Sequence, residues 1–411
     1  MTNISLNTRN IPENFIDSFK RAAADAGIER IAIVGGIIRD NLFQDAFKES
    51  IARSKDIDIC VEGSAYALAK KIESNLGKER ASIIRINQSY NTVEMRIDDF
   101  SIDIASARRE NYPSPGENPQ VVSAKLEEDL YRRDFTINSI ALDLKSNTLI
   151  DLHDGRHAIK SRQLKFIHSK SVEEDPTRII RGARYASRLN LQIAPDSLSQ
   201  IKSTLRRWPW SYYQGPSKES IPPALSTRLR MELELLFQEK SYLNAIKCLQ
   251  EWGGLLLLDN ELQNDHSWEQ RLNLALKLGI APLSAFIAKS NEATNIAERL
   301  QLAKKEQALL AASREFQGFF KPITSIDEYL SWKPSKWCKE IENLNYHPDV
   351  IGLNISLSHP LSEFFLHWLK DWRKVKSPLS AQELLENGFR EGPLLKKELE
   401  RLRFEKLDSI Y

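Results

Sequence analysis

Two aspartates, Asp56 and Asp58, alternate with isoleucine in the run KDIDICV, whose composition predicts a strand. Side chains at i and i+2 project from one face of a strand, so the two carboxylates are expected to stand side by side. Such a pair repels itself unless a cation is present, and two hard oxygen ligands suit Mg²⁺ ions that also bind phosphates. Asp103, in the run SIDIAS, is a candidate additional carboxylate. Taken alone, the pattern is also consistent with exposed strand aspartates that hold no metal.

A glycine pair, Gly35 and Gly36, ends the short apolar run IAIVGG and precedes a predicted helix. Backbone N–H groups and the helix dipole favour an anion at such a turn, and Arg39 could add a charge-assisted bond to a triphosphate. An ordinary tight turn is the alternative. The run matches neither the GxxxxGK[ST] phosphate loop nor the GxGxxG dinucleotide fingerprint. Because the glycine turn lies upstream of the paired aspartates, the two features together predict a phosphate site beside a metal site.

Two adjacent arginines, Arg132 and Arg133, are followed by Asp134 and Asn138 just before another predicted strand. Guanidinium groups match phosphate oxygens, and the acid could orient them. An internal salt bridge is the competing interpretation of the same residues.

A predicted helix that begins with three acids and a proline carries the fourth set. Helical spacing places its basic side chains on one arc of roughly 120°, with Asp175 at the edge. These side chains are Arg178, Arg181, Arg184 and Arg188. An acid and an arginine one turn apart can present an acceptor and a donor to the Watson–Crick edge of a base, while further guanidiniums hold phosphate.

The surrounding pattern predicts an α+β protein. A helix is expected over 12–29, followed by short strand runs rich in Ile and Val and a hairpin near 136–155, which together indicate a mixed sheet with helices. From about Ser171 onward the apolar spacing is helical, and Pro and Gly punctuate the segments.

The composition is that of a folded protein, since 411 residues are 41% hydrophobic and 28% charged, and this length predicts two to four structural units. The chain has no uninterrupted apolar run of about 18 residues, and its start lacks a basic-then-apolar signal, so we expect a cytoplasmic protein with no membrane association. Cys60, Cys248 and Cys338 lie far apart and are expected to be reduced thiols.

The net charge is only +2, but residues 151–250 carry 17 basic against 10 acidic side chains. A basic middle segment is typical of a protein that binds a polyanion there, and a solvated basic helix face is the alternative.

The four motifs, in this order and spacing, resemble those of the class II tRNA nucleotidyltransferases and bacterial poly(A) polymerases. The resemblance runs from Ile31 to Leu189 and continues weakly through Leu225 to Leu233 and a tail-like run at 384–402. It implies four parts, which are a nucleotidyltransferase head at 1–150, a helical neck at 151–240, a helical body at 241–340 and a helical, tRNA-binding tail at 341–411.

The resemblance also implies roles for the residues of the head. Asp56 and Asp58 match metal-binding carboxylates, at which Mg²⁺ would activate the primer 3′-hydroxyl and neutralise the leaving pyrophosphate. Gly36 and Arg39 match contacts to the triphosphate, as does the pair formed by Arg132 and Arg133.

In the neck, Asp175 and Arg178 match the pair that selects CTP or ATP without a nucleic-acid template. Arg181 and Arg184 match further nucleotide contacts. The protein is therefore expected to add CCA, or its terminal A, to the 3′ end of tRNA. The long segment between Asp103 and Arg132 favours this activity over addition of CC alone.

Other interpretations stay open. They are a poly(A) polymerase acting on other RNA 3′ ends, a CC-adding subtype, a non-catalytic RNA-binding protein and, from His153 and Asp154, a phosphohydrolase metal centre. An insert at 206–216 mixes basic and aromatic residues, which could stack on unpaired RNA bases or form a buried cap. The oligomeric state is not predicted.

Overall fold

The computed structural model describes residues 11–48, 55–207, 222–320 and 326–411, and the chain divides into two compact units at Met1–Leu257 and Leu258–Tyr411. Most of the predicted basic and aromatic insert falls in 208–221 and therefore lies outside the described residues. The predicted division into four parts is a finer one than these two units, and it stays a prediction.

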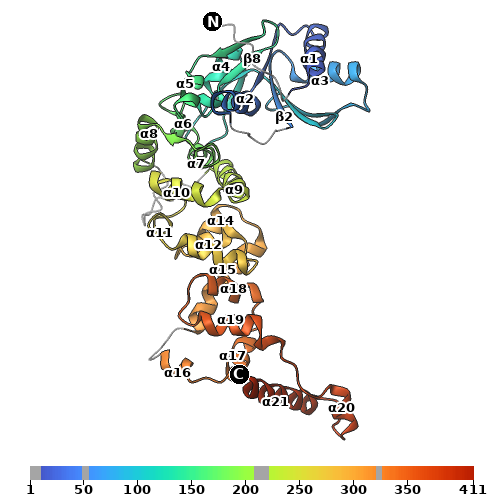
Figure 1. Ribbon diagram of the computed structural model, residues 1–411, viewed down its shortest axis with the longest axis vertical. Coiled ribbons are helices and arrows are strands. Elements are labelled where there is room, and N and C mark those ends of the chain that lie inside the picture. Colours follow the sequence, from blue (N-terminus) through green and yellow to red (C-terminus); the bar gives the residue numbers. More distant parts are fainter. Residues whose placement is uncertain (1–10, 49–54, 208–221, 321–325) are drawn as a thin grey trace. The chain divides into compact units, whose positions relative to one another are not determined.

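A seven-stranded mixed sheet organises the first unit, in the order β3-β4-β5-β2-β1-β8-β9 (Figure 1). Its strands are β1 (Arg30–Val34), β2 (Asp56–Glu62), β3 (Ala81–Asn87), β4 (Thr92–Ile97), β5 (Phe100–Ser106), β8 (Ile140–Asp143) and β9 (Thr148–Asp151). Strands β2 and β5 run parallel, and the other neighbouring pairs are antiparallel. Two small ladders accompany the sheet, one formed by β6 (Arg108–Asn111) and β7 (Gln120–Ser123), the other by β10 (Gln163–Leu164) and β11 (Gln192–Ile193).

Helices complete the first unit. Those up to Tyr131 are α1 (Glu13–Asp25), α2 (Gly36–Phe47), α3 (Ala65–Leu76) and α4 (Leu126–Tyr131). They are followed by η1 (Thr136–Asn138), α5 (Gly155–Lys160), α6 (Ser171–Glu174), α7 (Thr177–Leu189), α8 (Pro195–Arg206), α9 (Pro223–Gln238), α10 (Tyr242–Trp252) and η2 (Gly254–Leu257).

Burial explains why these segments fold as they do. Helices α1 and α3 lie side by side against the sheet (Figure 1), and their apolar residues Phe15, Phe19, Leu68 and Ile72 are buried. The apolar residues of α7, Ile179, Ile180, Ala183 and Ala186, are buried too, and the helix packs against α9 and α10. The fold expected from the sequence, a mixed sheet followed by helices, is confirmed, and the small β6–β7 and β10–β11 ladders are additions to it.

The second unit is helical. It contains α11 (Asn260–Gln263), α12 (Trp268–Lys277), α13 (Pro282–Ile287), α14 (Ala293–Arg299), α15 (Lys304–Phe319), α16 (Ile326–Leu330), α17 (Pro334–Asn343), α18 (Pro348–Ser356), α19 (Ser362–Lys370), η3 (Trp372–Lys374), α20 (Ala381–Glu386) and α21 (Pro393–Ile410). Part of its core is aromatic, since the fully buried Trp337 stacks on Phe364 with ring centroids 4.7 Å apart. Across the described residues, no helix is both long enough and apolar enough to span a bilayer.

Candidate functional site

A cavity of about 740 Å³ in the first unit brings most of the predicted site residues together. Its lining includes Gly35, Gly36, Arg39, Asp56, Asp58, Arg132, Arg133, Asp134, Asn138, Asp175, Arg178 and Arg181. Two predicted residues, Asp103 and Arg184, lie outside the lining that the described residues form. The cavity thus joins side chains from the sheet to side chains of α7 and the segment before it.

The glycine turn is fitted closely to Asp58. Gly35 has φ +76°, and a Cβ placed there would collide with the Asp58 carboxylate. Asp58 lies opposite Val34 in the β1–β2 ladder and accepts a hydrogen bond from the backbone N–H of Gly36. The turn that begins α2 and the second aspartate of β2 therefore form one local structure.

Two carboxylates lie beside each other where β2 pairs with β5. Asp58 and Asp103 are partners in the parallel register of β2 and β5. Burial raises the pKa of Asp58, although Arg133 opposes the shift, and burial together with the charge of Asp58 raises the pKa of Asp103. Both shifts mark a site where negative charge is costly, and a nearby cation would lower that cost.

The chemistry of the Asp56 and Asp58 carboxylates suits a divalent cation. Asp56 and Asp58 line the cavity from one strand, and both offer the hard oxygen ligands that Mg²⁺ prefers. Among the described residues, no group of three or more His, Cys, Asp or Glu side chains is arranged to hold a metal ion. The pair would therefore need ligands from substrate or water to complete a metal's coordination.

Arg39 is buried and fully engaged with its surroundings. Its guanidinium bonds Asn138 Oδ1 at 2.8 Å and pairs with Asp40 at 2.7 Å. It also lies 5.0 Å from the ring centroid of Tyr185 on α7, whose ring is in turn contacted by Arg188 at 5.1 Å. Arg39 therefore ties α2 to α7.

Tyr185 lines the cavity, and the sequence analysis did not select it. The signal was present, because helical spacing puts this position between Arg178 and Arg181 on the basic arc. An aromatic ring among arginines can be held by cation–π contacts, and Arg39 and Arg188 make such contacts with Tyr185.

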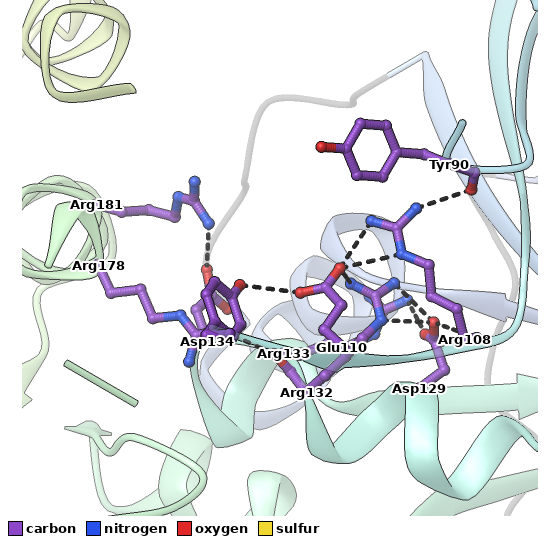
Figure 2. A network of polar contacts seen from close by, with 10 residues as sticks. Tyr90, Arg108, Glu110, Asp129, Arg132, Arg133, Asp134, Arg178 and Arg181 are labelled. Atoms are coloured by element: carbon purple, nitrogen blue, oxygen red, sulfur yellow. Dashed lines mark hydrogen bonds and ion pairs between the residues drawn. The ribbon is translucent and has the colours of Figure 1, made fainter. Parts of the chain in front are cut away.

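The adjacent arginines share a buried partner, as Figure 2 shows. Asp129 is fully buried, with Oδ1 2.6 Å from Arg132 Nη2 and Oδ2 3.1 Å from Arg133 Nη2. Although burial opposes the shift, the two guanidiniums hold the pKa of Asp129 below its ordinary value. Internal ion pairs therefore exist, as the alternative interpretation required. Arg133 Nε is nevertheless buried with no hydrogen-bond partner in the described part of the chain, so a donor remains for a ligand.

Asp134 joins the head to α7. Its carboxylate accepts a hydrogen bond from Asn138 Nδ2 at 2.9 Å. It also accepts one from Arg181 Nη1 at 3.3 Å (Figure 2). Although burial opposes the shift, Arg181 and Asn138 hold the pKa of Asp134 below its ordinary value. The acid thus orients an arginine that lines the cavity, although that arginine comes from α7 and not from the adjacent pair.

Asp175, which precedes α7, and Arg178, in its first turn, both line the cavity. Asp175 is the extended residue before Pro176, and its Oδ1 accepts from Thr177 Oγ1 at 2.8 Å. Arg178 Nη2 donates to the backbone carbonyl of Arg132 at 3.0 Å, while its Nη1 is buried and has no hydrogen-bond partner among the described residues. An oriented acceptor and an unsatisfied donor thus line one cavity, which is what recognition of a base edge requires.

Arg184 differs from the expectation of an open basic arc. Its guanidinium bonds Glu232 on α9 at 2.7 Å and Glu239, the residue directly after α9, at 3.2 Å. Glu232 also bonds Arg181 at 2.7 Å. Glu232 therefore holds two of the predicted basic residues, and a nucleotide contact by Arg184 stays a prediction.

The long segment between Asp103 and Arg132 contains the β6–β7 hairpin. Arg108, Glu110, Tyr112 and Asn118 from this segment line the cavity. Its polar contacts with Arg132 are drawn in Figure 2. The sequence analysis did not select these residues, because their role depends on a hairpin that the polar sequence did not predict.

Comparisons with known proteins agree with the motifs. Residues 31–165 match the family described as the poly A polymerase head domain. The CCA-adding enzyme of Streptococcus gordonii is 32% identical over 403 residues, which cover 93% of this chain and 90% of that protein. The CC-adding tRNA nucleotidyltransferase of Deinococcus radiodurans is 30% identical over 319 residues, which cover 75% of each protein. The chain belongs to the class II tRNA nucleotidyltransferase and poly(A) polymerase family.

The match to a third relative covers most of this chain but less than half of that relative. The A-adding tRNA nucleotidyltransferase of Aquifex aeolicus is 29% identical over 404 residues, which are 93% of this chain but only 45% of that protein. The fold agrees with a solved structure of a CCA-adding enzyme in an apo form, with a TM-score of 0.72, 21% identity and coverage of 98% of this chain and 94% of the other. The three relatives are named for adding A, CC and CCA, so membership of the family does not fix the product.

Proposed function

We propose that this enzyme transfers nucleotidyl groups from CTP and ATP to the 3′ end of tRNA, adding CCA or its terminal A without a nucleic-acid template. The observation that carries the proposal is the shared cavity. The glycine turn, the paired carboxylates of β2, Asp175 and Arg178 all line it, and the buried Nη1 of Arg178 has no hydrogen-bond partner among the described residues.

Each part of the cavity has a task in this proposal. Backbone N–H groups at the start of α2, together with Arg133, would hold the triphosphate. Asp56 and Asp58 would hold Mg²⁺, which when bound supplies charge neutralisation at the reacting phosphate and activates the attacking hydroxyl. Asp175 and Arg178 would select the base, because a wrong edge leaves buried polar groups unpaired.

Recognition of tRNA would rest mainly on phosphate and shape, since one protein must accept many tRNA sequences. The excess of basic side chains over 151–250 supports this view. Binding of tRNA should therefore weaken steeply as salt rises.

A poly(A) polymerase is the second candidate, because the matched head-domain family carries that name and both activities would use the same cavity. The substrate separates the two. The chain is incubated with tRNAs that end before the first C, before the second C and before A, and with an unrelated RNA, each with labelled CTP or ATP. We expect C on the first two tRNAs, A on the third, and none on the unrelated RNA.

Other outcomes would change the proposal. Long A tracts on the unrelated RNA would favour the polymerase, addition of C without A would indicate the CC-adding subtype, and no incorporation on any RNA would refute the enzyme.

The carboxylates are tested with matched variants. The double variant Asp56→Ala/Asp58→Ala should lower incorporation by at least about 10³-fold, because several kcal/mol of charge stabilisation would be lost. Binding of tRNA should stay within about twofold. Asp99→Ala removes an exposed carboxylate that pairs with Lys55 outside the cavity, and it should retain activity. Chelation should abolish incorporation and added Mg²⁺ should restore it. Persistent incorporation by the double variant would refute the metal assignment.

A further inference from the structure

The β6–β7 hairpin forms one wall of the nucleotide cavity, and its root is anchored to the head. Glu110 has only 6% of its side chain exposed, and its Oε1 lies 2.9 Å from both Arg108 Nη2 and Arg132 Nη1 (Figure 2). The Tyr112 hydroxyl donates to Glu110 Oε2 at 3.0 Å. These contacts fix where the hairpin leaves the head.

The tip of the same hairpin is held by the neck. Arg228, on α9, donates from Nη2 to the carbonyl of Gly116 at 2.8 Å and from Nη1 to Asn118 Oδ1 at 3.0 Å. The backbone N–H of Gly116 donates to the carbonyl of Glu174 at 3.1 Å. The tip is therefore docked beside the segment that leads into α7.

The same guanidinium also reaches the acid proposed to select the base. Arg228 Nε lies 3.6 Å from Asp175 Oδ1, and Arg228, Asn118 and Asp175 all line the cavity. Thr177 holds the same oxygen by its N–H and its hydroxyl. Asp175 Oδ1 is thus hydrogen-bonded by the start of α7, and it lies within ion-pair distance of the arginine that holds the hairpin tip, whose Nε has no hydrogen-bond partner among the described residues.

We propose that Arg228 is a positioning residue for base selection. By bridging the hairpin tip and Asp175, it makes the wall of the cavity and the selecting carboxylate move as one body. This inference rests on the proposed function and deepens it. A planar guanidinium has donors directed at several acceptors at once, which the single ammonium of lysine does not reproduce.

The test compares Arg228→Ala and Arg228→Lys with Arg230→Ala, a matched control on the same helix that ion-pairs with Glu234 and lies outside the cavity lining of the described residues. Equilibrium affinities for CTP, ATP, GTP and UTP are measured on the full chain, and kcat and KM for incorporation are measured on tRNA. Arg228→Ala should reduce the preference for CTP and ATP over GTP and UTP on the order of 10- to 100-fold, as a displaced selecting group would. Arg228→Lys should recover only part of that loss, and Arg230→Ala should match the parent protein.

A second readout separates positioning from general stability. Hydrogen exchange of the backbone amides over 112–119 should accelerate at least about tenfold in Arg228→Ala and not in Arg230→Ala, because the tip loses its anchor. Asn118→Ala removes one tip contact and leaves the arginine in place, so it should give a smaller loss in the same direction. The double variant Arg228→Ala/Asn118→Ala should lose no more nucleotide discrimination than Arg228→Ala alone, since the two residues act through one contact.

Several results would overturn the inference. Unchanged discrimination among the four nucleotides, unchanged exchange at the tip, or additive losses in the double variant would each do so. A uniform loss of tRNA affinity with selectivity intact would make Arg228 a phosphate contact instead. Failure of the parent protein to extend tRNA would refute the proposed function, whereas the nucleotide affinities and the exchange rates would still decide the role of Arg228.

Discussion

The carboxylate of Asp58 occupies the space that a Cβ at Gly35 would need. The two residues are far apart in sequence, but the pairing of β1 with β2 places Asp58 opposite Val34, and the N–H of Gly36 donates to its carboxylate. Glycine is therefore required here for two reasons, which are a positive φ and the close approach of a side chain that lines the cavity.

Replacing Gly35 with alanine should separate these two reasons. We expect Gly35→Ala to lower incorporation by at least about 10²-fold, because the methyl group would displace Asp58 from its place in the cavity. Gly77→Ala is the matched control, since Gly77 has φ +82° but open space around its Cβ position. Both variants should lose roughly 1–2 kcal/mol of folding free energy from backbone strain. Equal activity of the two variants would show that the contact with Asp58 is unimportant.

The sequence was sufficient for the features that depend on local spacing. The alternation of Asp56 and Asp58 predicted two carboxylates on one strand, and the helical spacing of Arg178 and Arg181 predicted side chains that now line one cavity. Regular geometry fixes such relationships once the type of element is known.

The long-range partners of those residues could not be predicted, because they are set by tertiary packing. Glu232 pairs with Arg184 across a separation that no local period encodes. Asp129 differs, because it pairs with Arg132 at an i, i+3 spacing that the sequence analysis did not use. The role of Arg228 was hidden for the same reason, since it depends on where the tip of a hairpin docks. Pairing energies for such residues depend on burial, which a sequence pattern gives only for the regular faces of helices and strands.

Arg178 is predicted to control selectivity more than affinity for RNA. Its buried Nη1 has no hydrogen-bond partner among the described residues, so a base edge is the natural acceptor. Arg178→Ala should cost about 1–3 kcal/mol of discrimination between correct and incorrect bases, or roughly 10- to 100-fold, measured as the ratio of kcat/KM values. Affinity for tRNA should stay within about twofold. Arg207→Ala, which removes an exposed arginine at the end of α8, is the control, and a similar loss of selectivity in it would contradict the assignment.

His168 should make the first unit sensitive to acid. Burial, together with Arg178, lowers the pKa of His168 from 6.5 to about 4. The unfolded chain therefore binds the proton first as the pH falls, and the free energy of unfolding should decrease between about pH 6.5 and pH 4 by on the order of 2 kcal/mol. Glu174 lies 3.4 Å away, but burial raises the pKa of its carboxyl, which limits its ability to stabilise an imidazolium.

Two variants check this pH dependence by denaturant unfolding at pH 7.5 and pH 5. His168→Gln should flatten the fall in stability, because the titrating group is gone. His157→Gln, at an exposed position on α5, should keep the dependence of the parent protein. An equally steep fall in His168→Gln would assign the acid sensitivity to other groups.

Glu232 is predicted to be the most costly acid to neutralise on α9. Its side chain is only 8% exposed and it pairs with both Arg181 and Arg184 at 2.7 Å. Although burial opposes the shift, Glu232 and Asp134 raise the pKa of Arg181 above its ordinary value. A guanidinium is not deprotonated in proteins, so Arg181 stays charged when Glu232 is replaced. Glu232→Gln should therefore destabilise the protein by about 3 kcal/mol, because two partly buried cations would lose their shared counter-charge. Glu234→Gln, on the same helix with 51% of its side chain exposed and 3.6 Å from Arg230, should cost less than about 1 kcal/mol, since exposed pairs contribute little. Denaturant unfolding of the two variants measures the difference, and equal losses would mean that burial does not set the strength of the pairs that hold α7 to α9.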